Sequence, residues 1–223
     1  MFNIDGIVKA LQSDKNLQKN VMTGAAGLAA GMLLSGGKLG KLVGSTAKVG
    51  AVAAIGSLAW QAWQNYQKNQ PGAPSSSQDA FVPPPQASYQ TEELGKTLVR
   101  AMIAAAKADG QIDAEEKDRI FKRLETMQLT AEEKAFVFDE LSSPLDIDAV
   151  VARADTPEHA AEIYAASLVA MVPDTPTERA YLETLSTKLN LAPALVAEIH
   201  RTAGLESSMP ANIAEAYTPT SNV

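Results

Sequence analysis

The sequence contains no cysteine, which excludes disulfide bonds, thiolate metal sites and a cysteine nucleophile. It contains only two histidines, His159 and His200, and neither has another histidine or a cysteine one helical turn away, so a zinc site is not expected. Each lies near an end of an expected helix, where a capping or surface role is usual. No Gly-rich phosphate loop, nucleophile elbow or zinc-protease motif is present. These absences predict a protein that is not an enzyme and holds no cofactor.

Charge is divided unevenly along the 223 residues. Residues 1–70 have no arginine, seven lysines and two acidic residues, which give a net charge of +5. Residues 91–223 have twelve basic and twenty-three acidic residues, which give a net charge of −11. A basic end of this kind is typical of a segment that meets a membrane surface or a polyanion. The acidic part is unsuited to nucleic acid, because phosphate neutralisation requires clustered Lys and Arg.

Glycine is concentrated near the start, where ten of the fourteen glycines precede residue 57. Two uncharged runs, 21–37 and 49–67, each approach the roughly 20 apolar residues that a membrane-spanning helix needs. Gly27 and Gly31 are four residues apart, a spacing that lets two helices approach closely in lipid. The second run ends on residues typical of an interfacial belt: Trp60, Trp63 and Tyr66. The prediction is a short polar segment, 1–19, followed by a membrane-associated hairpin or single span over 20–68.

Two alternatives stay open for the Gly-rich segment. It could form a pair of Gly/Ala-rich helices that pack on themselves in water, or its first run could belong to a cleaved signal peptide. The lysines between the two runs favour the cytoplasmic side, which predicts an exported C-terminal domain: Lys38, Lys41 and Lys48. If the segment is a hairpin, the lysines ahead of the first run favour the opposite membrane orientation: Lys9, Lys15 and Lys19.

Residues 69–90 are rich in Pro and Ser and predict a semi-extended tether without a core of its own. After the tether, apolar residues recur with the helical period over 91–204, and strand alternation is absent. The fold class is therefore all-α, with six or seven helices in this domain and a loose tail over 205–223. The positions expected in its core are Leu94, Leu98, Met102, Ile103, Ile120, Phe121, Leu124, Phe136, Val137, Leu141, Tyr181, Leu182, Leu185, Leu189, Leu195, Val196 and Ile199.

Capping patterns mark where the helices begin. Three capping boxes are expected, in which a first residue caps the helix and a Glu three positions later reaches back: Asp113 with Glu116, Thr130 with Glu133, and Thr175 with Glu178. Proline at the first helical position marks further starts, at Pro157, Pro176 and Pro193, and Gly204 is expected to end the last helix. A faint internal repeat accompanies these signals, because Glu116 to Leu129 and Glu178 to Leu191 have the same spacing.

Residues 104–116, AAAKADGQIDAEE, resemble the signature of TerB-like domains, a helical fold named after tellurite-resistance proteins. Residues 173–185, PDTPTERAYLETL, look like the matching second repeat. With its Gly-rich segment and Pro-rich linker, the chain over about 20–204 is similar to the YebE-like inner-membrane proteins, a bacterial family of unassigned function. The resemblance implies a helical bundle with a pseudo-repeat at the bacterial inner membrane, and it implies no substrate.

The acidic turn after residue 108 also matches the later half of an EF-hand loop. Ala105 and Lys107 stand where that loop needs oxygen ligands, so an EF-hand site is not expected. A local interpretation is sufficient, in which Gly110 ends one helix and the acidic residues cap the next. TerB-like domains have been considered metal-binding because of this turn, so the resemblance implies a weak site for a hard divalent cation. Its ligands would come from both repeats: Asp109, Asp113, Glu115, Glu116, Asp174 and Glu178.

Together these observations favour a membrane-anchored, non-catalytic helical interaction module. Its expected partners are membrane lipid and either another protein or a second copy that associates through the Gly-rich helices, with no nucleic acid. The resemblance implies a context of envelope stress or tellurite-type resistance, and the lysines between the two uncharged runs predict that the helical domain is in the periplasm. The alternative hypothesis is a divalent-metal sensor that uses the acidic turns. An enzyme would need a pocket with converging polar groups.

Overall fold

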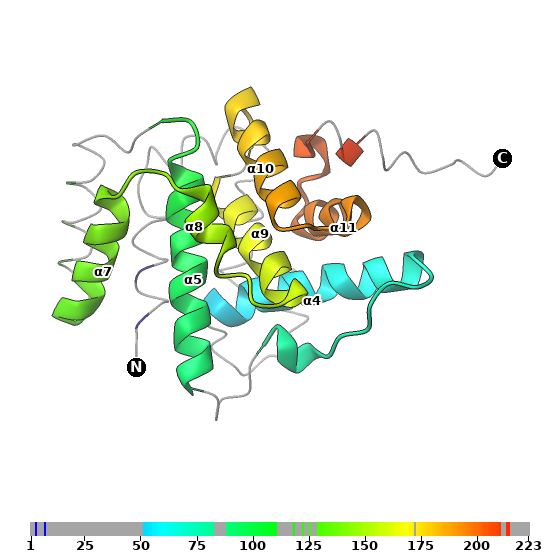
Figure 1. The fold of residues 1–223 in the computed structure, drawn as a ribbon, viewed down its shortest axis with the longest axis horizontal. Coiled ribbons are helices and arrows are strands. Elements are labelled where there is room, and N and C mark those ends of the chain that lie inside the picture. The colour runs from blue at the N-terminus through cyan, green and yellow to red at the C-terminus, as the bar shows by residue number, and fades with distance from the viewer. Residues whose placement is uncertain are drawn as a thin grey trace.

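A computed structural model gives the fold (Figure 1) and describes residues 3, 7, 51–82, 88–110, 118, 122, 125, 129–171, 173–210 and 213–214. These residues form helices α4 (Ala51–Asn69), α5 (Ser88–Ala106), α7 (Ala131–Ser142), α8 (Ile147–Val151), α9 (Pro157–Met171), α10 (Pro176–Lys188) and α11 (Pro193–Ala203), with 3-10 helices η1 (Gln78–Ala80) and η2 (Glu206–Ser208). They contain no strand, which confirms the all-α class.

Helix α9 is the centre of the fold. It is apolar on nearly every side, as expected for a helix surrounded by others, and eleven of its residues are buried. Its most extensive contact is with α5, and α4 contacts both α9 and α11 (Figure 1). The expected core positions that lie in the described part of the chain are buried, except Phe136, which is half-buried. The apolar periodicity therefore identified the inward faces of α5, α7, α10 and α11.

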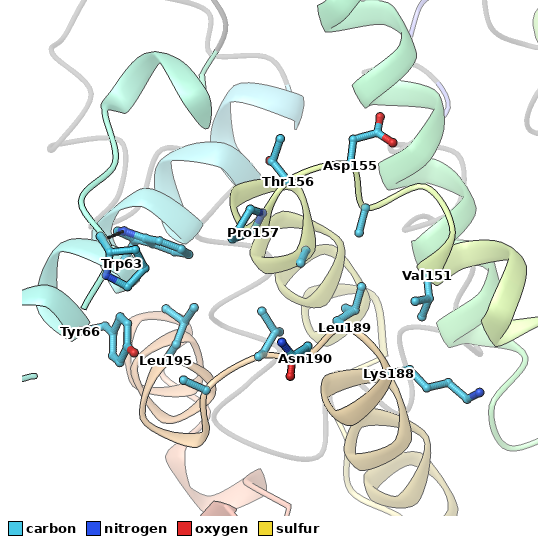
Figure 2. A pocket seen from close by; sticks show the side chains of 15 residues that line it. Trp63, Tyr66, Val151, Asp155, Thr156, Pro157, Lys188, Leu189, Asn190 and Leu195 are labelled. Carbon is cyan, nitrogen blue, oxygen red and sulfur yellow. Dashed lines mark hydrogen bonds between the residues drawn. The ribbon is translucent and has the colours of Figure 1, made fainter. Parts of the chain in front are cut away.

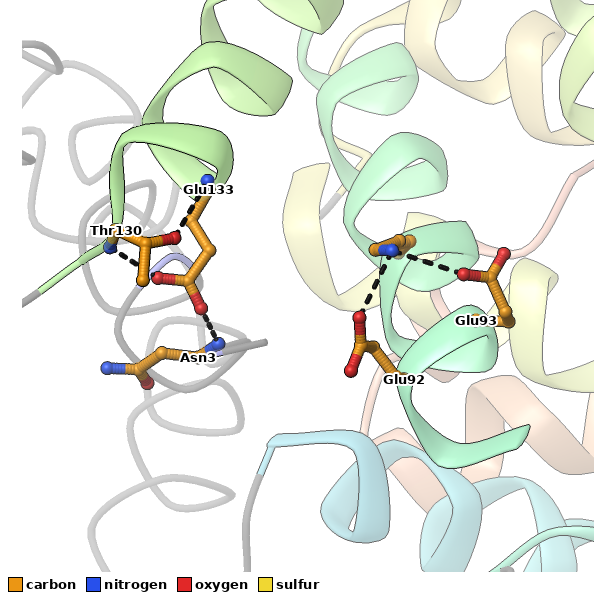
Figure 3. Close-up of polar contacts among 6 residues, drawn as sticks. Asn3, Glu92, Glu93, Thr130 and Glu133 are labelled. Carbon is orange, nitrogen blue, oxygen red and sulfur yellow. Dashed lines mark hydrogen bonds and ion pairs between the residues drawn. The ribbon is translucent and has the colours of Figure 1, made fainter. Parts of the chain in front are cut away.

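The local hydrogen bonds at the helix ends agree with the capping patterns. The Thr130 side chain accepts the Glu133 backbone N–H at 3.2 Å, and Glu133 Oε2 accepts the Thr130 N–H at 2.7 Å (Figure 3). The same reciprocal pair forms between Thr175 and Glu178, which confirms a second box. The remaining box, Asp113 with Glu116, lies outside the described residues.

Two helices end in a left-handed residue, as Schellman motifs do. Gly204 follows α11 at φ 73°, and the Leu205 N–H donates to the His200 carbonyl at 2.8 Å, which confirms the predicted helix end. Asn190 follows α10 at φ 53°, and the Leu191 N–H donates to the Ser186 carbonyl at 3.0 Å. The positive φ of Asn190 is therefore explained by the cap alone.

The second uncharged run does not form the membrane span expected over residues 49–67. It forms α4, whose apolar face packs against α9 and α11, and Trp63, expected in an interfacial belt, is only 2 % exposed. At its C-terminal end, Asn69 Nδ2 donates to Glu198 Oε1 of α11 at 3.0 Å. In the part of the chain that is described, no helix is both long enough and apolar enough to cross a bilayer. The first run, with Gly27 and Gly31, lies outside that part.

The expected tether over residues 69–90 also contributes to the core. Phe81 has no exposed surface, and its ring lies 5.6 Å from Trp60 and 5.5 Å from Trp63, measured between ring centroids. Helix α5 begins at Ser88, within the same stretch. Near the N-terminus, Ile7 is fully buried, and the Asn3 N–H donates to Glu133 Oε1 (Figure 3). The core thus includes segments that their polar or Pro-rich composition had placed outside it.

Candidate interaction cleft

A cleft of about 410 Å³ opens where the ends of several helices meet (Figure 2). Trp63 and Tyr66 of α4, with Leu195 of α11, line one side. Val151 at the end of α8 and Leu189 after α10 line the other. The cleft is therefore walled by aromatic and aliphatic side chains that come from parts of the sequence more than 80 residues apart.

The aromatic wall is held in place by hydrogen bonds to the loop after α4. The Trp63 indole N–H donates to the Pro74 carbonyl at 3.3 Å, and Gln67 Nε2 donates to the same oxygen at 2.6 Å. The Trp63 and Tyr66 rings meet edge to face with their centroids 6.3 Å apart. Aromatic pairs of this geometry add stability beyond their buried area, so the wall is preorganised.

Polar groups lie at the rim of the cleft and do not converge on one point. Lys188 Nζ pairs with Asp148 Oδ1 at 2.5 Å, and its side chain extends away from the aromatic wall (Figure 2). Asp155 is exposed, with its carboxylate directed away from Trp63 and Tyr66 (Figure 2). The described lining residues include no histidine, and none pairs a nucleophile with a base. Their chemistry suits apolar side chains of a ligand better than a reaction.

A second hollow, of about 420 Å³, lies between α5, α7 and α8. It contains cations, but two of them already hold the structure together. Lys107 Nζ donates to the carbonyls of Glu140 and Ser143, both at 2.5 Å, which satisfies the end of α7. Arg100 pairs with Glu140, and its guanidinium lies 4.7 Å above the Phe136 ring. These contacts explain the hollow as part of the joint between α5 and α7.

The six residues expected to ligate a cation have different surroundings. Asp113, Glu115 and Glu116 lie outside the described residues. Asp109 is exposed after α5, and Asp174 is exposed before α10. Glu178 is buried, which raises the pKa of its carboxyl. Its Oε2 accepts hydrogen bonds from the backbone N–H groups of Asp174 and Thr175 and from the Thr175 hydroxyl, at 3.0, 2.9 and 2.9 Å.

Glu178 is therefore engaged in capping α10. The described residues contain no group of three or more His, Cys, Asp or Glu side chains arranged to hold a metal ion. The cation site stays a prediction that depends on residues 111–117.

The sequence model of a family described as "Protein of unknown function (DUF533)" matches residues 19–203. The chain belongs to the DUF533 family. The matched range includes α4 through α11, so both walls of the cleft fall within the DUF533 region. No curated protein and no solved structure matches the chain.

A buried acidic side chain in this DUF533 protein was not anticipated from the sequence. Glu162 of α9 is fully buried, and neither of its carboxylate oxygens has a hydrogen-bond partner among the described residues. Burial, with a smaller contribution from Glu158, raises its pKa well above the usual 4.5. An acidic residue within an apolar helix pattern was the available signal, but the pattern alone does not reveal which side of α9 is covered.

The expectation of a capping or surface role is wrong for His200. It is fully buried in the DUF533 core, where its Nε2 lies 2.9 Å from the Tyr164 hydroxyl and its Nδ1 lies 3.2 Å from the Leu205 carbonyl. The carbonyl can only accept, so Nδ1 carries the proton and Nε2 accepts from Tyr164. Burial lowers the pKa of His200 to about 4 and raises that of Tyr164. The pair is neutral and ties α9 to α11.

Proposed function

We propose that this DUF533 protein is a non-catalytic interaction module whose cleft binds an apolar segment of a protein partner, flanked by Lys or Arg. The cleft is the observation that carries the proposal. Its volume of about 410 Å³ lies in the range of roughly 300–1,000 Å³ typical of ligand sites. Tyr66 is half-buried and is held against the almost fully buried Trp63, so it supplies rigid aromatic surface. Aromatic residues are enriched among those that dominate binding energy at protein interfaces.

The basic flanks of the proposed partner follow from the charge around the cleft. Asp155 is exposed at the rim, and Glu158 follows within one turn of α9. Lys188, the cation among the described lining residues, is paired with Asp148. The region over 91–223 has a net charge of −11, which attracts a basic partner and repels an acidic one.

In this proposal the membrane anchor is the basic, Gly-rich stretch over residues 20–50, because α4 belongs to the helical core. The lysines of this stretch suit the anionic surface of a membrane. The similarity to TerB-like domains and to YebE-like proteins supports a bacterial inner-membrane address. The lysines between residues 38 and 48 favour the cytoplasmic side and so support a periplasmic helical domain.

Substituting Ala154 by Phe is expected to block the cleft. Ala154 is half-buried and lines the cleft, so an aromatic ring at this position occupies the space that a partner side chain would fill. The full chain is used to select from a library of displayed peptides, and we expect enrichment of an aromatic or aliphatic residue beside Lys or Arg. Synthetic peptides of the enriched sequence should bind Ala154→Phe at least about tenfold more weakly, a loss of about 1.4 kcal/mol.

Two charge variants test the electrostatic part of the same prediction. Asp155→Lys at the rim should weaken peptide binding more at low than at high salt, because the flanking cations are then repelled. Asp139→Lys, the same change on the exposed side of α7, should leave binding unaltered. Peptides without an apolar residue, or equal affinity for the native chain and Ala154→Phe, would remove the cleft as the binding site.

Protease treatment of cells tests the proposed address. In intact bacteria the helical domain should be protected, and it should be cut once the outer membrane is permeabilised, with the chain recovered in the membrane fraction. Protection that persists after permeabilisation would place the domain in the cytoplasm and contradict the orientation inferred from the lysines. Recovery in the soluble fraction would contradict the anchor.

A further inference from the structure

An acidic side chain with no hydrogen-bond partner among the described residues, Glu162, lies where α4 meets α9. A Cβ atom built on Gly56 of α4 would lie 3.0 Å from Glu162 Oε1 and 2.0 Å from the Phe81 carbonyl oxygen. Glu162 is therefore directly beneath the point where α4 and residues 78–82 cover α9. Buried polar groups are nearly always hydrogen-bonded, so a carboxyl with both oxygens unpaired requires an explanation.

No positive charge among the described residues compensates this carboxyl. Helix α4 has no charged residue before Lys68, and Asp79 of η1 is exposed. On α9 itself the charge that acts on Glu162 is that of Glu158, which has the same sign and interacts with the neighbouring His159. Charged groups on the other helices that pack on α9 are engaged elsewhere: Lys96 with Glu92 and Glu93, Arg100 with Glu140, Lys107 with two carbonyls, Glu178 in its cap, Glu198 with Asn69 and Arg201, and neutral His200 with Tyr164.

These surroundings accept a neutral carboxylic acid and not a carboxylate. An ionised group without a partner in an apolar interior costs several kcal/mol, and the protein avoids that cost either by retaining the proton or by admitting water. Retention agrees with the raised pKa of Glu162. Admission of water requires the covering layer, α4 with residues 78–82, to move away from α9.

We propose that α4 and residues 78–82 stay docked on α9 only while Glu162 holds its proton, and that transfer of this proton to solvent releases them. Release would also dismantle the cleft, because Trp63 and Tyr66 on α4 form one of its sides. The inference stands on the packing of α4 against Glu162 and does not depend on what the cleft binds.

The direction of the pH effect follows from the raised pKa of the docked state. Docking is fully favoured below the usual pKa of 4.5 and weakens as the pH rises towards the raised pKa of Glu162. Between these two values the ratio of undocked to docked α4 increases about tenfold per pH unit. His200 does not contribute to this change above pH 6, because burial lowers its pKa to about 4.

Native-state hydrogen exchange of the full chain between pH 6 and 9 tests whether the docking of α4 depends on the proton of Glu162. Protection factors, corrected for the intrinsic pH dependence of exchange, are measured for the amides of α4 in the native chain and in Glu162→Gln. We expect protection of α4 in the native chain to fall by up to about tenfold per pH unit until the pH reaches the raised pKa of Glu162. Glu162→Gln, which has a similar shape and cannot ionise, should give protection that does not change with pH.

A matched variant and a second replacement complete the test. Glu158→Gln, one turn earlier on α9, removes a neighbouring charge but leaves the Glu162 carboxyl, so the pH dependence should persist. Glu162→Met supplies an apolar side chain of similar length if the Gln variant does not fold. The proposal is overturned if protection of α4 is independent of pH in the native chain, or if it falls with pH equally in the Glu162 variants.

Discussion

A chain that begins at residue 91 is expected not to fold cooperatively, although helical periodicity marks 91–204 as a domain. This fragment lacks α4, whose buried face contacts α9 and α11. Four large side chains on that face, Val52, Ile55, Leu58 and Trp63, are at most 7 % exposed. Each contributes about 1.5–3 kcal/mol on burial, so their loss approaches the whole stability of a domain, about 5–15 kcal/mol.

The measurement compares thermal unfolding of two fragments by far-ultraviolet circular dichroism. A fragment of residues 49–223 retains α4 and Phe81 and should unfold in one cooperative transition. The fragment of residues 91–223 should show a broad transition, or none, and should bind a hydrophobic dye at room temperature, as chains without fixed packing do. If both fragments unfold cooperatively at similar temperatures, α4 is not required for the fold.

The helix starts were predictable because their signals are local. A capping box needs only Thr and Glu three residues apart, and the structure forms this bond pattern at Thr130 and Thr175. The inward faces of α5 and α10 were predictable for the same reason, because one period of the sequence defines them. Such signals place an element and its buried side, but they do not identify the element that covers that side.

The role of α4 was not predictable in this way. An Ala-rich helix with no charge before Lys68 buries the same surface against lipid as against another helix, and its partner α11 lies more than 120 residues further along the chain. One signal did favour a protein partner. Gln61 and Gln64 are half-buried polar residues on the side of α4 away from its buried residues, which is the pattern of a helix with one wet face.

The cleft and the buried Glu162 depend on contacts between distant segments. The cleft brings Trp63 near Leu189, and neither residue belongs to a recognisable binding motif. Glu162 becomes unusual only because α4 and Phe81 cover it, since an acidic residue on an uncovered face of a helix would need no partner. The family match extends over both segments and assigns no role to either.

Substituting Gly56 by Ala is expected to destabilise the protein by about 2 kcal/mol, the opposite of its usual effect in a helix. Ala is favoured over Gly by about 1 kcal/mol in a helix interior. Here the added Cβ would lie 2.0 Å from the Phe81 carbonyl oxygen, a distance that forces α4 or residues 78–82 to shift. Overpacking of this kind costs about 1–3 kcal/mol and occasionally more, and the contact with rigid backbone puts the cost at the upper end.

The change is measured as the midpoint of thermal unfolding, which should fall by roughly 4–8 °C for a chain of this size. Ser57→Ala, at the neighbouring half-buried position of α4, is the matched control and should raise the midpoint slightly or leave it unchanged, because Ala is the better helix former. If Gly56 served only the contact between helices in lipid, its replacement by Ala would not lower the stability of the folded domain. Equal or greater stability of Gly56→Ala would therefore contradict the close approach of Phe81 to α4, whereas the expected loss assigns this glycine to the packing of the domain.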